Sequence, residues 1–144
     1  MKVSTRGRYG LRAMVELAKH EGEGAIPLRK IAENQNISEQ YLEQLFSNLR
    51  KSQLVKSVRG AKGGYMLASP PEETSVKEVI AALEGPIAPT DCVLDNDNSC
   101  ENEKDCSTHD LWDRLQDCII EMLDSVTLAD LMKNSSKSKE WYYE

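Results

Sequence analysis

The chain has 144 residues, enough for one domain, or one domain with an arm, around a sizeable hydrophobic core. No apolar run reaches the length of about 18 residues that a membrane span needs, and the first residues lack the apolar segment of a secretory signal. The net charge of -6 hides a split, because residues 1–65 hold 12 Lys and Arg against 6 Asp and Glu, whereas residues 66–144 hold 6 against 18. We expect a cytoplasmic protein without membrane contact, whose basic half can face a polyanion.

The first helix is predicted over residues 4–19, where apolar residues recur at helical spacing and a glycine-rich segment follows. Its expected buried stripe consists of Leu11, Met14, Val15 and Ala18. Three arginines lie near its start: Arg6, Arg8 and Arg12. Arginines at such a position either contact phosphate groups or are ordinary exposed charges.

A helix-turn-helix is predicted next. A short helical pattern follows Pro27, a tight turn comes after it, and Ser38 is a plausible N-cap for the second helix. The second helix carries an apolar stripe at i, i+3, i+4 and i+7, made of Leu42, Leu45, Phe46 and Leu49. The segments LVKSV and YML, joined by the turn-forming RGAKGG, then indicate a basic hairpin. A helix-turn-helix followed by such a hairpin is a winged helix.

The polar face of the second helix and the tip of the hairpin supply candidate DNA contacts. In this motif the second helix enters the major groove, which shows a distinct pattern of donors and acceptors for each base pair. We expect Glu43 to act in selectivity, since a carboxylate repels phosphate unless it accepts a hydrogen bond from cytosine N4. The candidate DNA-binding residues are Ser38, Gln40, Glu43, Gln44, Arg50, Arg59 and Lys62. The alternative is that these side chains form an ordinary solvated surface.

A further amphipathic helix is predicted after the capping box of Ser75 and Glu78, and it ends at Gly85. Residues 87–108 then show no period and are rich in Asp, Asn and Glu, which is typical of a functional or disordered loop. A long helix follows, and its apolar residues alternate by four and three: Leu111, Leu115, Cys118, Met122 and Val126. That seam fits pairing with a second copy of the chain, or packing on the chain's own domain.

Within that helix we expect Cys118 to be a buried small hydrophobe. Three other cysteines and a histidine gather near the loop with the spacing C-x7-C-x5-C-x2-H: Cys92, Cys100, Cys106 and His109. In a cytoplasmic protein such a set is more typical of a metal or cofactor site than of disulfides. The residues leave a structural zinc site and a mixed-ligand 2Fe-2S cluster both open. A bound cationic centre would order the acidic loop.

The motifs STRGRYGLRAMVELA and YLEQLFSNLRKSQLVKSVRGAKGGYML, with the cysteine and histidine set, resemble the BadM/Rrf-two family of bacterial winged-helix regulators, and within it the iron-sulfur cluster regulators. The resemblance covers about residues 1–133. It implies a homodimer formed through the long helix, a pseudo-palindromic double-stranded DNA operator, and repression of cluster-assembly operons when a 2Fe-2S cluster is bound. The implied cluster ligands are Cys92, Cys100, Cys106 and His109.

Two features compare this chain with other branches of that family. His109 argues against the nitric-oxide-sensing branch, which has the cysteines without this histidine, and the branch that regulates cysteine metabolism lacks the cysteine set. The first cysteine gap here is seven residues long, whereas the family usually has five.

The predicted fold class is mainly α with a small β-hairpin. The predicted parts are a winged helix-turn-helix over residues 1–85, a cluster-binding loop over 86–108, a dimerisation helix with a short final helix over 109–133, and a flexible tail over 134–144. The predicted function is a homodimeric, DNA-binding transcription regulator that senses iron-sulfur status. The alternatives are a zinc-stabilised or metal-free regulator of the same family, responding to nitric oxide, redox state or cysteine metabolism, and a protein-docking scaffold. An enzyme is not expected, because the sequence has no phosphate loop, nucleophile elbow or H-E-x-x-H motif.

Overall fold

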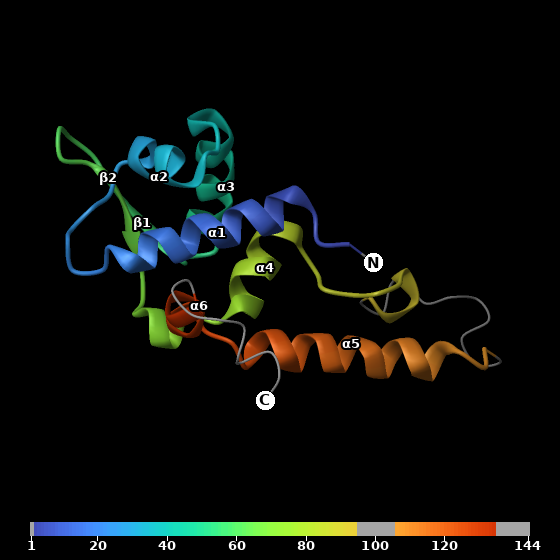
Figure 1. Cartoon of the computed structure of the whole chain (residues 1–144). Helices are drawn as coiled ribbons and strands as arrows, with labels where there is room; N and C mark the ends of the chain where they lie inside the picture. Colours follow the sequence, from blue (N-terminus) through green and yellow to red (C-terminus); the bar gives the residue numbers. More distant parts are fainter. Residues whose placement is uncertain (1, 95–105, 135–144) are drawn as a thin grey trace.

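The computed structural model describes residues 2–94 and 106–134. Figure 1 shows a mainly helical body with one hairpin and one helix that runs beneath and beyond it. The helices are α1 (Thr5–Lys19), α2 (Leu28–Gln35), α3 (Glu39–Lys51), α4 (Val76–Glu84), α5 (His109–Asp124) and α6 (Leu128–Asn134). The strands are β1 (Val55–Val58) and β2 (Gly64–Leu67), and the short 3-10 helices are η1 (Pro71–Glu73) and η2 (Asp91–Val93). The predicted fold class is confirmed. No described helix is both long and apolar enough to cross a bilayer.

Helix α1 lies at the centre of the hydrophobic core, with α2 and α3 against one side and α4 and α6 against another (Figure 1). Its buried residues include Met14 and Ala18, as predicted, but also Ala13 and Leu17. Leu11 and Val15 of the predicted stripe are only partly buried, although both pack against the core. A helix with neighbours on two sides buries a wider arc than a single stripe.

The start of α1 is fastened to the end of α4. The backbone N–H of Ser4 donates to Glu84 Oε1 at 2.6 Å, and the Ser4 hydroxyl donates to the same oxygen. The two helices approach closely, since a Cβ atom on Gly10 would lie 2.3 Å from Leu83 Cδ1. Only glycine fits at that crossing without a shift of Leu83.

The helix-turn-helix forms as predicted. Helix α2 ends at Asn36, whose φ of 55° is left-handed, and the N–H of Ile37 donates to Ala32 O at 3.0 Å. Ser38 then caps α3, its hydroxyl accepting a hydrogen bond from the N–H of Tyr41 at 3.1 Å. All four residues of the predicted apolar stripe of α3 are buried, so the opposite face of the helix is directed to solvent.

The hairpin of β1 and β2, with the loop between them, is called the wing. The strands pair antiparallel, with Val55 opposite Leu67 and Val58 opposite Gly64. Tyr65 joins the wing to the body, because its N–H and C=O both pair with the backbone of Ile26, at 2.9 and 2.8 Å. Its ring lies 5.0 Å from that of the fully buried Phe46, centroid to centroid. The position of the wing relative to α3 is therefore fixed by a backbone bridge and an aromatic contact.

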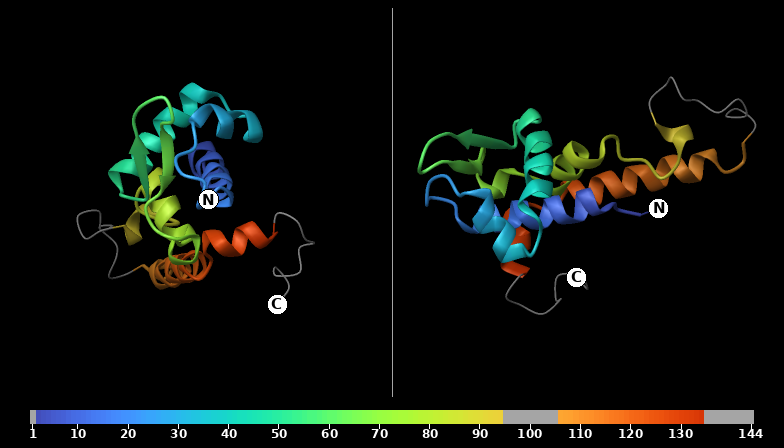
Figure 2. Two further views of the ribbon diagram at one scale, coloured as in Figure 1. Left: turned by 90° about the vertical axis from the view of Figure 1, so that its left-hand side faces the viewer. Right: turned by 90° about the horizontal axis from the view of Figure 1, so that it is seen from above.

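Helix α5 projects beyond the rest of the body, as the second view in Figure 2 shows. None of its residues is buried, and Cys118 is exposed, so the expectation of a buried Cys118 was wrong for the single chain. Backbone hydrogen bonds just after α5 return the chain to the body: Val76 N–H donates to Val126 O, and Leu128 N–H to Thr74 O. Leu128, in α6, is fully buried in the core around α1.

Candidate nucleic-acid interface

The exposed face of α3 carries the polar side chains that the sequence singles out. Gln40, Glu43, Gln44 and Arg50 are exposed, on the opposite side of the helix from its buried leucines. Ser38 is also exposed at the N-cap. Its oxygen accepts a backbone hydrogen bond, and its O–H remains able to donate to an incoming group.

A hollow between α3 and the wing brings several of these residues together. Glu43 and Arg50 line it from the helix, and Ser57, Arg59 and Tyr65 line it from the wing. The structure thus places a carboxylate and two arginines on one concave surface. This hollow is a single surface that a nucleic-acid strand can occupy while it touches both elements.

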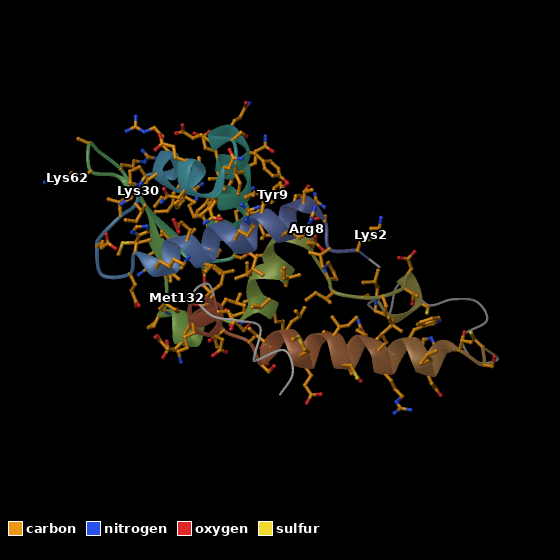
Figure 3. All side chains as sticks on the ribbon, in the orientation of Figure 1. Lys2, Arg8, Tyr9, Lys30, Lys62 and Met132 are labelled. Carbon is orange, nitrogen blue, oxygen red and sulfur yellow. The ribbon has the colours of Figure 1, made fainter. Side chains whose placement is uncertain are left out.

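Lys62 lies on the other side of the wing. It lines a separate hollow with Glu23 and Pro27, and Figure 3 shows it at the far end of the wing from the body. Neither Lys62 nor Arg59 forms an ion pair with any residue in the described part of the chain. Both cations are exposed, so a polyanion meets them without first displacing a carboxylate.

Two contacts that hold α1 against the end of α2 were not predicted from the sequence. The guanidinium of Arg12 donates to Gln35 O at 2.6 Å and to Gln35 Oε1 at 3.3 Å, which fixes α1 against the end of α2. The buried Glu16 accepts a hydrogen bond from Asn34 Nδ2 at 2.8 Å in the same region. Both contacts join residues about 20 positions apart, a separation that has no local sequence signal.

The described part of the cysteine loop holds two of the three predicted ligand cysteines. Cys92 is partly buried in η2, where its Sγ lies 3.1 Å from Thr90 Oγ1. Cys106 is exposed, and the Thr108 hydroxyl, 3.3 Å from its Sγ, lowers the pKa of the thiol below its ordinary value, helped by the backbone N–H groups of Thr108 and His109. His109 is the first residue of α5. Cys100 lies outside the described residues.

These ligand candidates suit a soft metal centre in their chemistry. Thiolates and an imidazole are the donors that zinc and iron-sulfur clusters take, and a lowered thiol pKa favours the ligating form. The arrangement is less complete, since among residues 2–94 and 106–134 no three His, Cys, Asp or Glu side chains gather closely enough to hold a metal ion. Cys92, Cys106 and His109 therefore do not form a metal site by themselves in the described residues. The fourth predicted ligand is Cys100.

Helix α5 has three faces. Trp112, Ile119 and Leu123 are partly buried, and Ile119 and Leu123 line a hollow with Ile80 and Glu84 of the body. A second face is apolar and exposed, with Leu111 at 57% and Met122 at 49% of full exposure. That stripe consists of the exposed Leu111, Cys118 and Met122 together with the partly buried Leu115. The third face is acidic and includes Asp113, Asp117, Glu121 and Asp124. A contiguous apolar stripe on a projecting helix marks an interaction surface.

A helix-turn-helix with an exposed polar second helix and a basic wing defines a winged-helix DNA-binding protein. The model of the Rrf2 family, described as an iron-dependent transcriptional regulator, matches residues 3–134. The chain belongs to this family of transcription regulators. It is a DNA-binding regulator and not an enzyme.

Individual relatives align over almost the whole chain. The HTH-type transcriptional regulator CymR of Bacillus subtilis is 48% identical over 142 residues, which are 99% of this chain and 97% of the relative. The solved structure of CymR, described as the global cysteine regulator of B. subtilis, shares 49% identity and a TM-score of 0.76 over 93% of this chain and 98% of its own. The solved structure of IscR from T. potens shares 44% identity and a TM-score of 0.75, over 99% and 97% of the two chains.

These relatives confirm the predicted resemblance at the level of the family. The narrower prediction, a nearest likeness to the iron-sulfur cluster regulators, is not supported, since CymR at 48% is more similar than T. potens IscR at 44%. Sequence identity therefore shows a DNA-binding regulator without showing what it senses.

Proposed function

We propose that the chain is a homodimeric transcription regulator that binds a pseudo-palindromic operator in double-stranded DNA. Each subunit places α3 in the major groove and its wing in the adjacent minor groove. The observation that carries this proposal is the hollow in which Glu43 and Arg50 of α3 face Arg59 of the wing. Because Tyr65 and Phe46 fix the wing against α3, both elements meet the duplex as one rigid surface.

The exposed side chains of that surface have separate tasks. Gln40 and Gln44 carry amides, which pair with adenine edges. Ser38 and Arg50 lie at the two ends of α3 and donate to phosphate oxygens. Arg59 and Lys62 of the wing supply positive charge to the narrower groove, where direct base recognition is limited.

Replacing Glu43 by Ala should relax discrimination between operator sequences more than it lowers overall affinity. The Glu43 carboxylate lies in the hollow with two arginines. There it repels phosphate and accepts a hydrogen bond from a base donor such as cytosine N4–H. We expect a change in preference equivalent to about 1 to 3 kcal/mol at one base pair. Selection from a randomised duplex pool, followed by binding to the selected and mismatched sites, measures it. An equal loss at every sequence would contradict the role of Glu43 in selectivity, and Gln44→Ala serves as the comparison.

The exposed stripe of α5 supports the homodimer. Leu111 and Met122 expose about half of their surface in the single chain, and Leu115 and Cys118 complete a seam with spacings of four and three. A second copy of the same helix covers such a stripe through a two-fold axis, which gives an isologous contact. The same axis relates the two recognition helices and accounts for the pseudo-palindromic operator.

We further propose that the loop of residues 86–108 is the sensing element, with Cys92, Cys100, Cys106 and His109 holding a 2Fe-2S cluster. Such a cluster, when bound, supplies a redox-sensitive centre whose oxidation or loss is the signal. The support is the donor chemistry of the residues and the iron-dependent description of the family. We keep the predicted division of the chain: a DNA-binding part over residues 1–85, the sensing loop over 86–108, a dimerisation helix with the short final helix over 109–133, and a tail over 134–144.

The described contacts give the loop a physical connection to the DNA-binding body. Gln116 Nε2 donates to Ile87 O at 3.0 Å, which joins α5 to the start of the loop. Two residues before Pro86, Glu84 accepts the hydrogen bonds from Ser4 that fasten the start of α1. A change in the loop can therefore shift α5 and α1 together, and couplings of this kind are typically about 1 to 3 kcal/mol.

A second candidate function is regulation of cysteine metabolism without a metal. The observation that favours it is the 48% identity to CymR across 99% of this chain. In that case the dimer and its DNA contacts are the same, and the regulator responds to cysteine metabolism without a bound cluster. The remaining alternatives are a regulator stabilised by zinc and one that responds to nitric oxide or redox state. They differ from the main proposal only in what the loop of residues 86–108 binds or senses.

Protein purified without oxygen should separate these candidates. If the loop holds a 2Fe-2S cluster, the wild type is red-brown with about two irons and two sulfides per chain, and Cys92→Ala loses the colour. The matched control is Cys118→Ala, because Cys118 lies outside the proposed ligand set and should leave the spectrum unchanged. A colourless wild type with one zinc indicates the zinc-stabilised form, and a wild type without metal indicates the CymR-like candidate.

A further inference from the structure

One face of α1 lies beside the helix-turn-helix and carries two arginines. Thr5, Arg8, Tyr9 and Arg12 follow the spacing i, i+3, i+4 and i+7, so they share this face. Tyr9 contacts Tyr41 in the first turn of α3, with ring centroids 6.2 Å apart and planes at 88°. The hydroxyl of Tyr41 lies 3.3 Å from Thr5 Oγ1. The face is therefore continuous with the start of the recognition helix.

The two arginines on this face do different things. The guanidinium of Arg12 is held by two hydrogen bonds to Gln35, at the end of α2. The guanidinium of Arg8 lies 5.8 Å from the centroid of the Tyr9 ring and has no hydrogen-bond or ion-pair partner among the described residues. Arg12 also lies over the same ring, at 5.4 Å. Tyr9 thus places Arg8 on the surface with all of its donors available.

Among residues 2–94 and 106–134, no carboxylate forms an ion pair with the arginines of this face. The ion pair found in the described residues is that of His20 with Glu23, at the far end of α1. Arg8 and Arg12 are like charges four residues apart, and such pairs repel each other on a helix. Glu84, the last residue of α4, lies beside the start of α1, and its carboxylate accepts hydrogen bonds from Ser4. An anion placed beside Arg8 relieves the repulsion without displacing an existing partner.

The position of this α1 face relative to α3 and the wing indicates which kind of anion binds beside Arg8. In Figure 3 the labelled Lys62 and Arg8 lie on opposite sides of α2 and α3, and the view from above in Figure 2 agrees, with the wing at one end and the start of α1 toward the other. A recognition helix in the major groove has a phosphate strand on each of its sides, since that groove is about 12 Å wide. The wing covers one side, and Arg8 lies on the other.

We propose that Thr5, Arg8 and Tyr41 form a second anchor for the DNA backbone, which binds a phosphodiester on the side of α3 away from the wing. Arg8 supplies the charge and its N–H donors. The hydroxyls of Thr5 and Tyr41 share one hydrogen bond, which leaves one O–H to donate to the phosphate. Arg12 and Tyr9 are positioning residues. This inference rests on the proposed mode of DNA binding and adds a contact that the α3 face and the wing do not make.

Replacing Arg8 by Ala should weaken binding equally at all sequences. The test measures the affinity of the full chain for a random-sequence duplex of about 40 base pairs, roughly four helical turns, over a range of salt concentrations. We expect affinity to fall roughly tenfold at low salt, and the slope of log affinity against log salt to decrease by about one for each subunit in contact. Arg8→Lys keeps the charge and should recover most of the slope.

The matched control is Lys133→Ala, which removes one positive charge from an exposed position of α6 and should leave the slope unchanged. Preference between sites selected from a randomised pool should also be unchanged in Arg8→Ala, whereas it changes in Gln44→Ala. A salt slope in Arg8→Ala equal to that of the wild type, with DNA binding retained, would overturn the anchor alone. A wild type whose binding to duplex DNA is weak and independent of salt would instead overturn the proposed function.

Discussion

Replacing both Leu111 and Met122 by Asp should produce a folded monomer that has lost most of its operator affinity. The two side chains are the most exposed large apolar residues on α5, and carboxylates at those positions face each other across any two-fold axis through the stripe. A dimer binds its second half-site as an intramolecular event, so its loss should lower affinity roughly 10² to 10⁴-fold. Sedimentation measures the mass, and titration of a selected two-half-site duplex measures the affinity.

The control for that experiment is Asp117→Lys, an equally large change on the acidic face of the same helix. It should leave the mass and the affinity near those of the wild type. Thermal unfolding of the double variant should remain cooperative, because neither side chain contributes to the core around α1. A double variant that stays dimeric would show that the apolar stripe is not the contact between subunits.

Replacing Phe46 by Ala should lower the free energy of unfolding by about 3 to 5 kcal/mol, a large part of the stability of a domain this size. Phe46 is fully buried, and it is the single phenylalanine of the chain. It also contacts Tyr65, so its loss should loosen the wing against α3. Urea unfolding followed by circular dichroism measures the first effect.

The second effect of Phe46→Ala is a loss of DNA affinity below the unfolding transition, because the wing no longer has one fixed position. Phe46→Leu leaves a smaller cavity and should lose markedly less stability. Val58→Ala is the control within the wing: Val58 is 42% exposed, and exposed substitutions usually change stability by less than about 0.5 kcal/mol. A change of less than about 1 kcal/mol in Phe46→Ala would contradict the central place of this ring in the core.

The sequence predicted α3 more closely than α1, and the reason is geometric. Helix α3 packs through one stripe and exposes the other side, so a 3.6-residue period identifies Leu42 and Leu49 correctly. Helix α1 is surrounded on two sides, so residues such as Ala13 and Gly10 are buried without being part of an apolar stripe. Burial of Gly10 follows from the approach of Leu83, more than 70 positions away.

The candidate DNA-binding residues could be read from the sequence because exposure on α3 follows from its period. The structure adds how they share surfaces: Glu43, Arg50 and Arg59 line one hollow, and Lys62 lines another. The contacts of Arg12 with Gln35 and of Tyr9 with Tyr41 depend on the packing of separate helices. No spacing within one helix can predict them.

The prediction for the long helix α5 was less complete than the prediction for α3. The alternation from Leu111 to Val126 indicates an apolar face but does not say whether the chain itself covers it. In the structure Val126 is buried against α4, whereas Leu111 and Cys118 are exposed. The seam is thus divided between the chain's own body and the surface offered to a second copy.

The burial of Leu128 has a consequence for the synthesis of the protein. This residue comes more than 60 positions after the wing, yet it lies in the same core as Met14, Ile31 and Phe46. At about 5 to 20 residues per second, a ribosome needs several more seconds after completing the wing to add α6. During that interval the core around α1 lacks one of its sides. We therefore expect a nascent chain to acquire a settled DNA-binding surface only when its translation is nearly finished.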